Sequence, residues 1–384
     1  MYSDMDFSLE AKKETFKIRW NIPFDTFNLG YPGGAEGPLP FAWDEEYKKA
    51  HGVLFEPSRF YKNSTTLAAR LELCNDTNEK IKIRAYIEDL IEYSLSFASD
   101  INGSKAVIYN FYFKRTDYEL RPGWVSAIGN GFMARGLIRI FESTGEQRHL
   151  SLAKQFIDHF FIFSSLSKKT VLPCFTWMDD DGYIWFDEYP GSDGLPSLVL
   201  NGHIHALLGI YHLAPHIHEK ERSKYIDLLM AGITTIKHKG KNFRRPGAIS
   251  RYSLREPEKP DYAPDRVVRQ FNYLYRMTGD RKFDEYATHF GEDIEKASWE
   301  IELIIEGASA RAEINDCFKG MEYAFYLLHE GNKVETRWYQ KEASATFDEL
   351  KAGCEYRIIG FRRKGDAPPA SKSTRSFFVL TNDS

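Results

Sequence analysis

The sequence has few cysteines, no long apolar run and no basic block, and each absence excludes a class of protein. The four cysteines are far apart and form no Cys-x-x-Cys pair, so neither a zinc site nor a disulfide framework is predicted. No segment approaches the roughly 18 apolar residues of a membrane span, and residues 1–17 lack the apolar segment of a signal peptide. We therefore expect a cytoplasmic protein without a membrane span.

The charges of the chain are nearly balanced. The formal net charge is -4 and no block of five or more Lys or Arg residues occurs, so a nucleic-acid partner is not expected. With 42% hydrophobic and 28% charged residues, the composition is that of a folded globular protein. A length of 384 residues exceeds one ordinary core, so two or three domains are expected.

Aromatic content is the unusual feature of the composition. Aromatic residues make up 15% of the chain, with 28 Phe, 22 Tyr and 7 Trp. Such side chains fill large cores, and exposed ones also stack on the apolar faces of sugars. Core packing is the more common explanation for any single one of them, so sugar binding needs further evidence.

Apolar residues recur at helical spacing in paired segments separated by short breaks, which predicts helical hairpins. The two clearest breaks contain Gly145, within Ser-Thr-Gly-Glu, and Gly279, within Met-Thr-Gly-Asp. Both glycines are expected at the left-handed position that ends a helix. Hairpins are expected over 67–97, 125–163, 195–236 and 267–294.

The repeated hairpins predict a mainly α fold, an α/α toroid, because a lone hairpin cannot bury its apolar face and stacked neighbours can. The stretches between hairpins would gather on one face, where ligands are expected to bind. From about Ile301 the pattern changes to short aromatic and β-branched runs between turn residues, which predicts a β-sandwich. This part resembles the small immunoglobulin-like domains attached to carbohydrate-active and sensory proteins. The expected divisions are an N-terminal extension packed on the toroid (1–62), the toroid (63–298) and the β-sandwich (299–384).

Three loops between the expected helices are rich in tyrosine and charge. The first contains Glu188-Tyr189-Pro190 and leads into Leu-Asn-Gly at 200–202. The second contains Tyr252 and Arg255, and the third contains Tyr262. Each of these residues alone has an ordinary explanation as a solvated charge, an ion-pair partner or a packed ring.

Taken together, these residues resemble the D-glucuronyl C5-epimerase family, in its C-terminal catalytic domain. The resemblance rests on Glu188-Tyr189-Pro190, on Leu-Asn-Gly at 200–202 and on Leu-Leu-Gly-Ile-Tyr at 207–211. The segment 122–127, Pro-Gly-Trp-Val-Ser-Ala, matches the entry to the first toroid hairpin of that family. The resemblance covers about residues 100 to 297.

The resemblance implies an isomerase that converts D-glucuronate to L-iduronate residues in a heparosan-like polymer, a step of polysaccharide biosynthesis. It implies no nicotinamide or other cofactor and no metal. The expected partner is the acidic polysaccharide itself, and a homodimer is one option for the assembly. The catalytic residues that the resemblance implies are Glu188, Tyr189, Tyr252 and Tyr262, and the expected substrate-binding residues are Trp124, Asn130, Asn201, Arg251 and Arg255.

The sequence departs from the family pattern at three positions. Tyr252-Ser253-Leu254-Arg255 stands where relatives have Tyr-Asp-Leu-Arg-His, so Ser253 and Glu256 replace an Asp and a His. Ala263 replaces a further His. The substrate contacts are therefore expected to differ, and a different uronate polymer is a plausible substrate.

The chemistry explains why such residues would be needed. Removing a proton next to a carboxylate adds charge to an anion, so the site must neutralise that carboxylate. Arg255 is the expected ligand, because a guanidinium binds a carboxylate through two N–H groups. Glu188 is expected on one face of the sugar and Tyr262 on the other, with Tyr252 assisting. Tyrosine suits proton donation because its pKa is about 10. His203 and His205, two residues apart on a helix, do not face each other, so they do not form a metal pair.

Three other functions stay open. A polysaccharide lyase on an α/α toroid would begin with the same C5 proton abstraction and then expel the C4 substituent. A glycoside hydrolase would need two carboxyls flanking the bond, which would be Glu188 with Asp187 or Asp265. A non-catalytic glycan-binding protein would use the β-sandwich as its binding domain.

Overall fold

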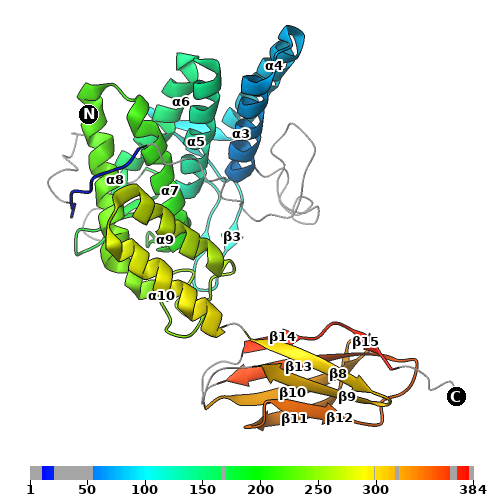
Figure 1. Ribbon diagram of the computed structural model, residues 1–384. Helices are drawn as coiled ribbons and strands as arrows, with labels where there is room; N and C mark the ends of the chain where they lie inside the picture. Colours follow the sequence, from blue (N-terminus) through cyan, green and yellow to red (C-terminus); the bar gives the residue numbers. More distant parts are fainter. Residues whose placement is uncertain are drawn as a thin grey trace. The chain divides into compact units, whose positions relative to one another are not determined.

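The computed structural model describes residues 11–20, 55–165, 170, 172–297, 299–315, 320–363 and 370–379. The chain divides into two compact units, residues 1–245 with 249–291 and residues 246–248 with 292–384 (Figure 1). The first unit contains the helical hairpins, and the second contains two β-sheets. In the described part of the chain, no helix combines the length and the apolar character needed to span a bilayer.

The described part of the first unit contains four helical hairpins, in the regions where the sequence predicts them. The first described helix begins at Pro57, earlier than the predicted start at Leu67, because a proline at the first helical position is compatible with the missing N–H. The predicted division at residue 62 therefore lies within this helix. The helices are α3 (Pro57–Leu73), α4 (Thr77–Leu95), α5 (Ala127–Thr144), α6 (Gln147–Asp158), α7 (Leu200–Leu213), α8 (Glu219–Lys239), α9 (Pro264–Thr278) and α10 (Arg281–Ala297).

The predicted glycine caps end α5 and α9. Gly145 has φ 73° and Gly279 has φ 71°, both in the left-handed region that favours glycine. Their backbone N–H groups donate to the carbonyls of Phe141 and Tyr275, each at 2.7 Å. The sequence prediction of these two helix ends is confirmed.

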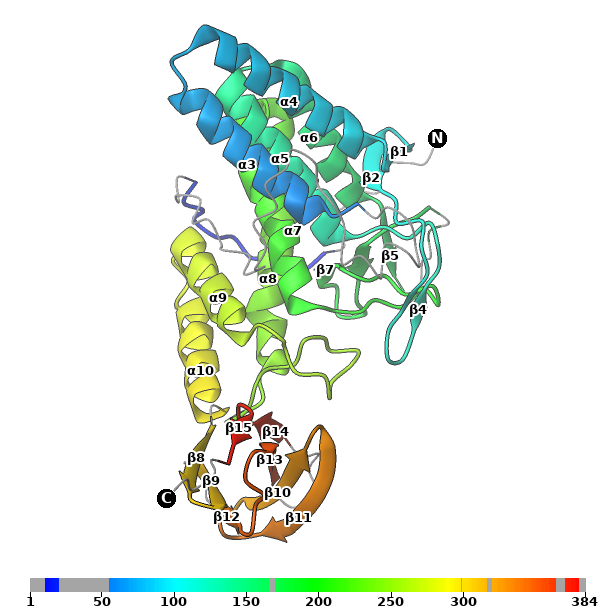
Figure 2. The same cartoon turned by 90° about the vertical axis from the view of Figure 1, so that its right-hand side faces the viewer.

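The first helices of the hairpins lie against one another. Helix α3 packs on α5, α5 on α7, and α7 on α9, and Figures 1 and 2 show α3, α5 and α7 side by side. Helix α7 is buried along its whole length. Glycines permit the closest approach, because a Cβ on Gly209 of α7 would lie 2.9 Å from Cα of Gly131 on α5. One continuous apolar core therefore joins the hairpins.

The described N-terminal segment, residues 11–20, is extended and lies on the first unit. The N–H of Glu14 donates to the hydroxyl of Thr234 on α8 at 2.8 Å. The N–H of Arg19 donates to the carbonyl of Met277 on α9 at 2.8 Å. These bonds connect the segment to two of the four hairpins.

Short strands occupy the connections between hairpins. Strand β5 pairs with β6 in parallel, and β6 pairs with β7 antiparallel. Strand β7 is followed directly by Asp187 and Glu188. The hairpin of β3 and β4 carries Arg115 in its turn. The strands are β1 (Ala98–Ile101), β2 (Ser104–Val107), β3 (Phe113–Lys114), β4 (Glu119–Leu120), β5 (Phe163–Ser165), β6 (Thr176–Met178) and β7 (Ile184–Phe186).

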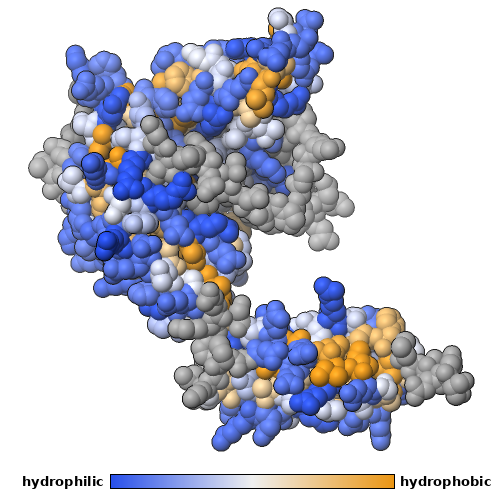
Figure 3. Space-filling view, in the orientation of Figure 1, coloured by the Kyte–Doolittle hydropathy of each residue, from blue (hydrophilic) through white to orange (hydrophobic). Residues whose placement is uncertain are grey.

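The second unit consists of two antiparallel sheets around one apolar core. One sheet has the order β11-β10-β13-β14 with β15 on β13, and the other has the order β12-β9-β8. Both sheets contribute to the core, for example Ile314 from β9 and Phe325 from β10. On β8, Ile304 and Ile305 are exposed, and Figure 3 shows apolar surface over this strand. The strands are β8 (Glu300–Glu306), β9 (Ser309–Asn315), β10 (Glu322–His329), β11 (Asn332–Gln340), β12 (Ser344–Phe347), β13 (Glu355–Arg363), β14 (Ala370–Ser373) and β15 (Phe377–Phe378).

Candidate active site

A cavity of about 550 Å³ lies in the first unit, between the start of α3 and the loops that precede α5, α7 and α9. This volume is within the usual range of about 300–1,000 Å³ for small-molecule sites. Its lining is rich in aromatic side chains. Six residues selected from the sequence line it, namely Glu188, Tyr189, Tyr252, Tyr262, Trp124 and Asn201.

Glu188 is positioned by bonds between the end of β7 and the start of α5. The hydroxyl of Ser126 donates to the Glu188 carbonyl at 2.7 Å, and the N–H of Ala127 donates to the Asp187 carbonyl at 2.9 Å. On the other side, the Glu188 side chain lies against Gly202 of α7. A Cβ on Gly202 would be 2.5 Å from Cβ of Glu188 and 2.6 Å from Oε2. The Leu-Asn-Gly motif therefore leaves the space that the Glu188 side chain occupies.

The Glu188 carboxyl is buried, with 6% of the residue exposed. The hydroxyl of Tyr252 donates to Oε1 at 3.3 Å, and Oε2 has no hydrogen-bond partner among the residues that the structure describes. Burial raises the pKa of this carboxyl above its ordinary value, against the opposing effects of Tyr189, Arg266, Arg115 and Tyr252. A carboxyl with a raised pKa is suited to accept and release protons near neutral pH.

Two tyrosines adjoin this carboxyl inside the cavity. Burial, and then the charge of Glu188, raise the pKa of Tyr189 and that of Tyr252 well above the ordinary value of 10.0. Both hydroxyls therefore keep their protons at neutral pH and can act as proton donors. The ring of Tyr252 lies 5.5 Å from the ring of Tyr262, measured between centroids. Tyr262 is 64% exposed, so it lies at the mouth of the cavity.

Arg266 on α9 supplies a guanidinium to the same cavity. Its Nη1 donates to the Tyr262 hydroxyl at 3.0 Å. Its Nη2 is 3.5 Å from Oδ1 of Asp261, an ion-pair distance, but Nε and Nη2 make no hydrogen bond within the described ranges. The side chain is 12% exposed. The guanidinium is thus held at the cavity wall by Tyr262 and Asp261, with its Nε and Nη2 buried.

Arg115, in the turn between β3 and β4, is the second guanidinium in the cavity. It lies over the rings of Tyr189 and Tyr252, at 4.8 and 5.5 Å from their centroids. Its Nε donates to Oε2 of Glu256 at 3.1 Å, and its Nη2 also bonds this oxygen. Burial opposes ionisation of Glu256, yet the bonds from Arg115 lower the pKa of its carboxyl below the ordinary value. Glu256, one of the departures from the family pattern, is thus the buried counter-ion of Arg115.

Three of the predicted substrate-binding residues do not line the cavity. Arg255 pairs with Asp193 and lies 3.9 Å over the ring of Tyr118, because its loop folds back on the segment that precedes α7. Arg251 donates to backbone carbonyls, including that of Asn242 at 2.8 Å.

Asn130 is the third of these residues, and its hydrogen bonds serve the fold. Its Oδ1 accepts from the N–H of Val107 at 3.1 Å. Its Nδ2 donates to the carbonyls of Lys105 and Phe156, at 2.8 and 3.0 Å. The amide connects α5 to β2 and to the end of α6, and both of its polar atoms are used.

Asp187, the neighbour of Glu188, points away from the cavity. Its Oδ2 accepts from the N–H of Ser197 at 2.8 Å, and its Oδ1 accepts from the N–H of Leu198 at 3.1 Å and from the Ser197 hydroxyl. Burial raises the pKa of this carboxyl to about 6, although these bonds oppose the rise. Asp187 and the exposed Asp265 do not line the cavity, so neither provides the second carboxyl of a hydrolase there.

Trp124 and Asn201 are held in place by neighbouring groups at the cavity wall. Trp124 stacks on Tyr109 with ring centroids 4.0 Å apart, and its indole N–H donates to the Phe111 carbonyl at 3.2 Å. The Oδ1 of Asn201 accepts from Nε2 of Gln270 at 3.0 Å. Both side chains present an ordered surface to a ligand.

Comparison with known proteins agrees with the motifs at this site. The pattern of the D-glucuronyl C5-epimerase C-terminus matches residues 102–292, which contain Glu188, the tyrosines and both cavity guanidiniums described above. Through this segment, the chain belongs to the D-glucuronyl C5-epimerase family. The D-glucuronyl C5-epimerase of Caenorhabditis elegans is 36% identical over 95 residues, which are 25% of this chain. That match spans 14% of the relative's length.

Solved structures with a partial likeness include two sugar-acting proteins. A cellobiose 2-epimerase from Bacillus thermoamylovorans has 13% identity and a TM-score of 0.40, with 68% of this chain and 64% of that chain covered. A family 76 α-mannanase from Bacteroides thetaiotaomicron has 15% identity and a TM-score of 0.39, with 63% of this chain and 61% of that chain covered.

Proposed function

We propose that the protein is a uronate C5-epimerase that converts D-glucuronate to L-iduronate residues within a heparosan-like polymer. Membership of the epimerase family supports this proposal. The observation that carries it is the buried Glu188 carboxyl, which accepts a hydrogen bond from Tyr252 inside a cavity whose lining includes the guanidiniums of Arg115 and Arg266. On this reading the stacked hairpins form part of an α/α toroid. A homodimer and a cytoplasmic location stay predictions.

The proposed reaction moves one proton and is neutral in electrons. A base removes the proton from C5, the resulting carbanion is stabilised as an enediolate on the sugar carboxylate, and an acid returns a proton to the opposite face. No oxidant is required, which agrees with the prediction that no nicotinamide takes part. The net change is inversion at C5.

Glu188 is the proposed base, because its buried carboxyl has a raised pKa and it is the acid nearest the tyrosines. Tyr252 donates a hydrogen bond to Glu188 and so lies on the same side of the sugar as the base; it is proposed to orient that carboxyl, with Tyr189 beside it. Tyr262 at the mouth is the proposed donor of the proton that returns to the opposite face, and its exposure lets solvent restore that proton. This keeps the expectation that Tyr262 serves the second face.

Arg266 is the proposed ligand of the uronate carboxylate, in place of Arg255. It lines the cavity, and a guanidinium can bind both oxygens of a carboxylate through two parallel N–H groups. Arg115 adds a second positive charge close to the tyrosines. Charge that develops in the enediolate would therefore meet fixed cations in a largely buried site, where electrostatic stabilisation is strongest.

The test is to incubate the protein with a heparosan-type polymer in deuterium oxide and to examine the product by NMR and by size. Deuterium at C5 without chain shortening would support the proposal. Absorbance from a new C=C bond would instead indicate a lyase, and new reducing ends would indicate a hydrolase. Binding of the polymer without exchange, lysis or hydrolysis would indicate a glycan-binding protein and refute the proposal.

A further inference from the structure

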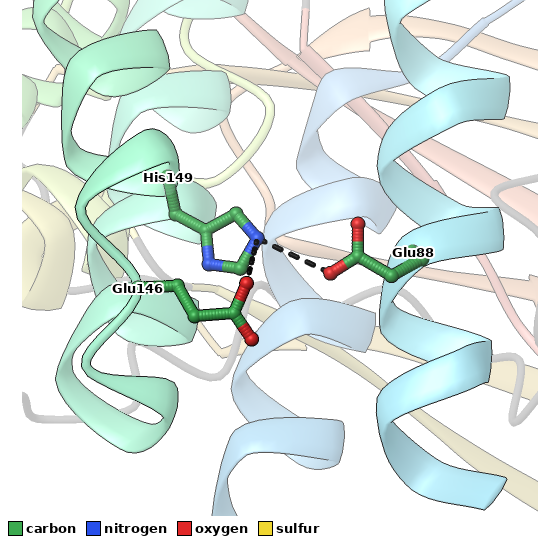
Figure 4. A group of neighbouring side chains, drawn as sticks. All are labelled: Glu88, Glu146 and His149. Atoms are coloured by element: carbon green, nitrogen blue, oxygen red, sulfur yellow. Dashed lines mark ion pairs between the residues drawn. The ribbon is translucent and has the colours of Figure 1, made fainter. Parts of the chain in front are cut away.

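A second cluster of ionisable groups lies away from the cavity, between the first two hairpins. Glu88 comes from α4, and Glu146 and His149 come from the start of α6, as Figure 4 shows. One ligand atom from each residue lies within 4.8 Å of the others. The His149 side chain is 1% exposed, whereas the carboxylates of Glu88 and Glu146 are 38% and 37% exposed. The cluster is therefore open on the carboxylate side.

The hydrogen bonds of Thr144 define the tautomer of His149. The Thr144 hydroxyl donates its single hydrogen to the Ile140 carbonyl at 2.8 Å. The same oxygen lies 3.1 Å from Nδ1 of His149, so it can only accept there. Nδ1 therefore carries the hydrogen, and a neutral His149 has its lone pair on Nε2.

That lone pair faces two carboxylates. Nε2 is 3.3 Å from Oε1 of Glu88 and 4.0 Å from Oε2 of Glu146, and it makes no hydrogen bond to any residue that the structure describes. A lone pair beside two anionic oxygens is unfavourable unless a cation lies between them. The cation is either a proton on Nε2 or a metal ion.

We propose that Glu88, Glu146 and His149 bind a divalent transition metal ion, with Zn²⁺ as the preferred one. Imidazole nitrogen and carboxylate oxygen are both zinc ligands, and three protein ligands leave a fourth position for water. Bonds of about 2.0–2.1 Å in a tetrahedral site place neighbouring ligand atoms about 3.3 Å apart. The separation of Nε2 from Glu88 Oε1 already has this value, at 3.3 Å.

The hydrogen bond from Nδ1 to Thr144 supports the same proposal. A metal-binding histidine usually donates its other ring N–H to an oxygen, which fixes the orientation of the ring. Because the ligands come from α4 and α6, the metal would connect the first hairpin to the second. Its proposed role is to stabilise the packing of these hairpins, and it takes no part in the reaction at the cavity.

Two arginines contact the same carboxylates and would have to move. Arg148 pairs with both Glu88 and Glu146, and Arg84 pairs with Glu146 at 3.1 Å. Their side chains are 58% and 45% exposed, so both can turn into solvent at little cost. In the absence of metal they neutralise the two carboxylates.

The test uses the metal-free full chain titrated with Zn²⁺ by calorimetry and with Co²⁺ by visible absorption. Three single variants are compared, His149→Gln, Glu88→Gln and the control His216→Gln. His216 is a suitable control because it faces a single carboxylate, with Nε2 at 3.2 Å from Oε1 of Glu142. Because His149 is buried and its replacement can unfold the chain, the partly exposed Glu88 provides an independent variant.

The proposal predicts one site per chain, a Co²⁺ spectrum typical of low coordination number, and a rise in Tm with Zn²⁺. Folded His149→Gln and Glu88→Gln proteins should bind at least about 10-fold more weakly, as for the loss of other metal-site groups. His216→Gln should bind as the unchanged chain does. The proposal would be overturned if all three variants bound Zn²⁺ equally well. It would also be overturned if the His149 ring carried hydrogen on both nitrogens at pH 7 with Zn²⁺ in excess.

Discussion

Substitution of Gly202 by alanine tests whether the Leu-Asn-Gly motif positions the catalytic carboxyl. The added Cβ would lie 2.5 Å from Cβ, 2.6 Å from Oε2 and 3.1 Å from Cγ of Glu188. Carbon atoms do not approach this closely, so the Glu188 side chain must move. The neighbouring hydrogen bond from Tyr252, which is already 3.3 Å long, would be lost or rearranged.

The expected effects on stability and activity differ in size. Alanine within a helix is favoured over glycine by about 1 kcal/mol. Overpacking a core costs about 1–3 kcal/mol, so the free energy of unfolding should fall by roughly 0–2 kcal/mol. Displacing a reactive group by about 1 Å reduces catalysis on the order of 100-fold. Gly202→Ala should therefore remain folded and lose most of its activity.

The assay is C5 deuterium exchange, measured beside urea unfolding. Gly136→Ala is the matched control, because a Cβ there would lie 2.5 Å from Cε1 of Phe60 in the packing of α5 against α3. It should lose similar stability and keep exchange within a few-fold of the unchanged chain. Full exchange activity in a folded Gly202→Ala protein would refute the reasoning, because Glu188 would then tolerate displacement.

Three further predictions concern charged groups at the site. Arg266→Lys should lower kcat/KM by about 10-fold or more, because a lysine cannot bind a carboxylate through a planar pair of N–H groups. Arg255→Lys should leave kcat/KM nearly unchanged, and equal losses of kcat/KM in the two variants would be inconsistent with Arg266 as the carboxylate ligand. Glu256→Gln should lower the free energy of unfolding by about 3–5 kcal/mol in a denaturant titration, since it leaves Arg115 buried without its ionised partner. A loss below about 1 kcal/mol would argue against a stabilising ion pair between Arg115 and Glu256. The pKa of Glu188 is raised above 4.5, and the base must be ionised to act. The value of kcat/KM should therefore fall on acidification with an apparent pKa above 4.5. An acidic limb of the pH profile with an apparent pKa at or below 4.5 would contradict the raised pKa of Glu188.

Local patterns were sufficient to predict the hairpins and the glycine-capped ends of two helices. Gly145 and Gly279 could be placed at helix ends because the left-handed conformation is a property of single residues. Glu188 and Tyr252 were found through motif resemblance, and the structure brings them within hydrogen-bond distance. The start of α3 at Pro57 was missed because the buried position between Tyr61 and Leu67 is occupied by the polar Ser64, which interrupts the apolar pattern.

Long-range contacts could not be predicted from the sequence. Arg255 was chosen for its place beside Tyr252, but its partner is Asp193, 62 residues away in the chain. Arg115 reaches the tyrosines from a different loop, and its pairing with Glu256 spans 141 residues. The residues of the proposed metal site come from two hairpins, so the pair Glu146 and His149, three residues apart, did not reveal the third ligand, Glu88. The adjacent basic residues Lys114 and Arg115 within the aromatic segment 109–118 were the one local signal for Arg115.

The central claim is that Glu188 exchanges the C5 proton. The most direct measurement compares the rate of C5 deuterium exchange in folded Glu188→Gln protein with the rate in Glu56→Gln protein. Glu56 is a suitable control because it also lines the cavity but pairs with Arg59. Both proteins are incubated with heparosan-type polymer in deuterium oxide, and deuterium at C5 is read by NMR. The account predicts exchange at least about 100-fold slower in Glu188→Gln, the usual contribution of an acid–base group, and near-normal exchange in Glu56→Gln. Continued exchange in Glu188→Gln would remove Glu188 from the chemistry and contradict the account.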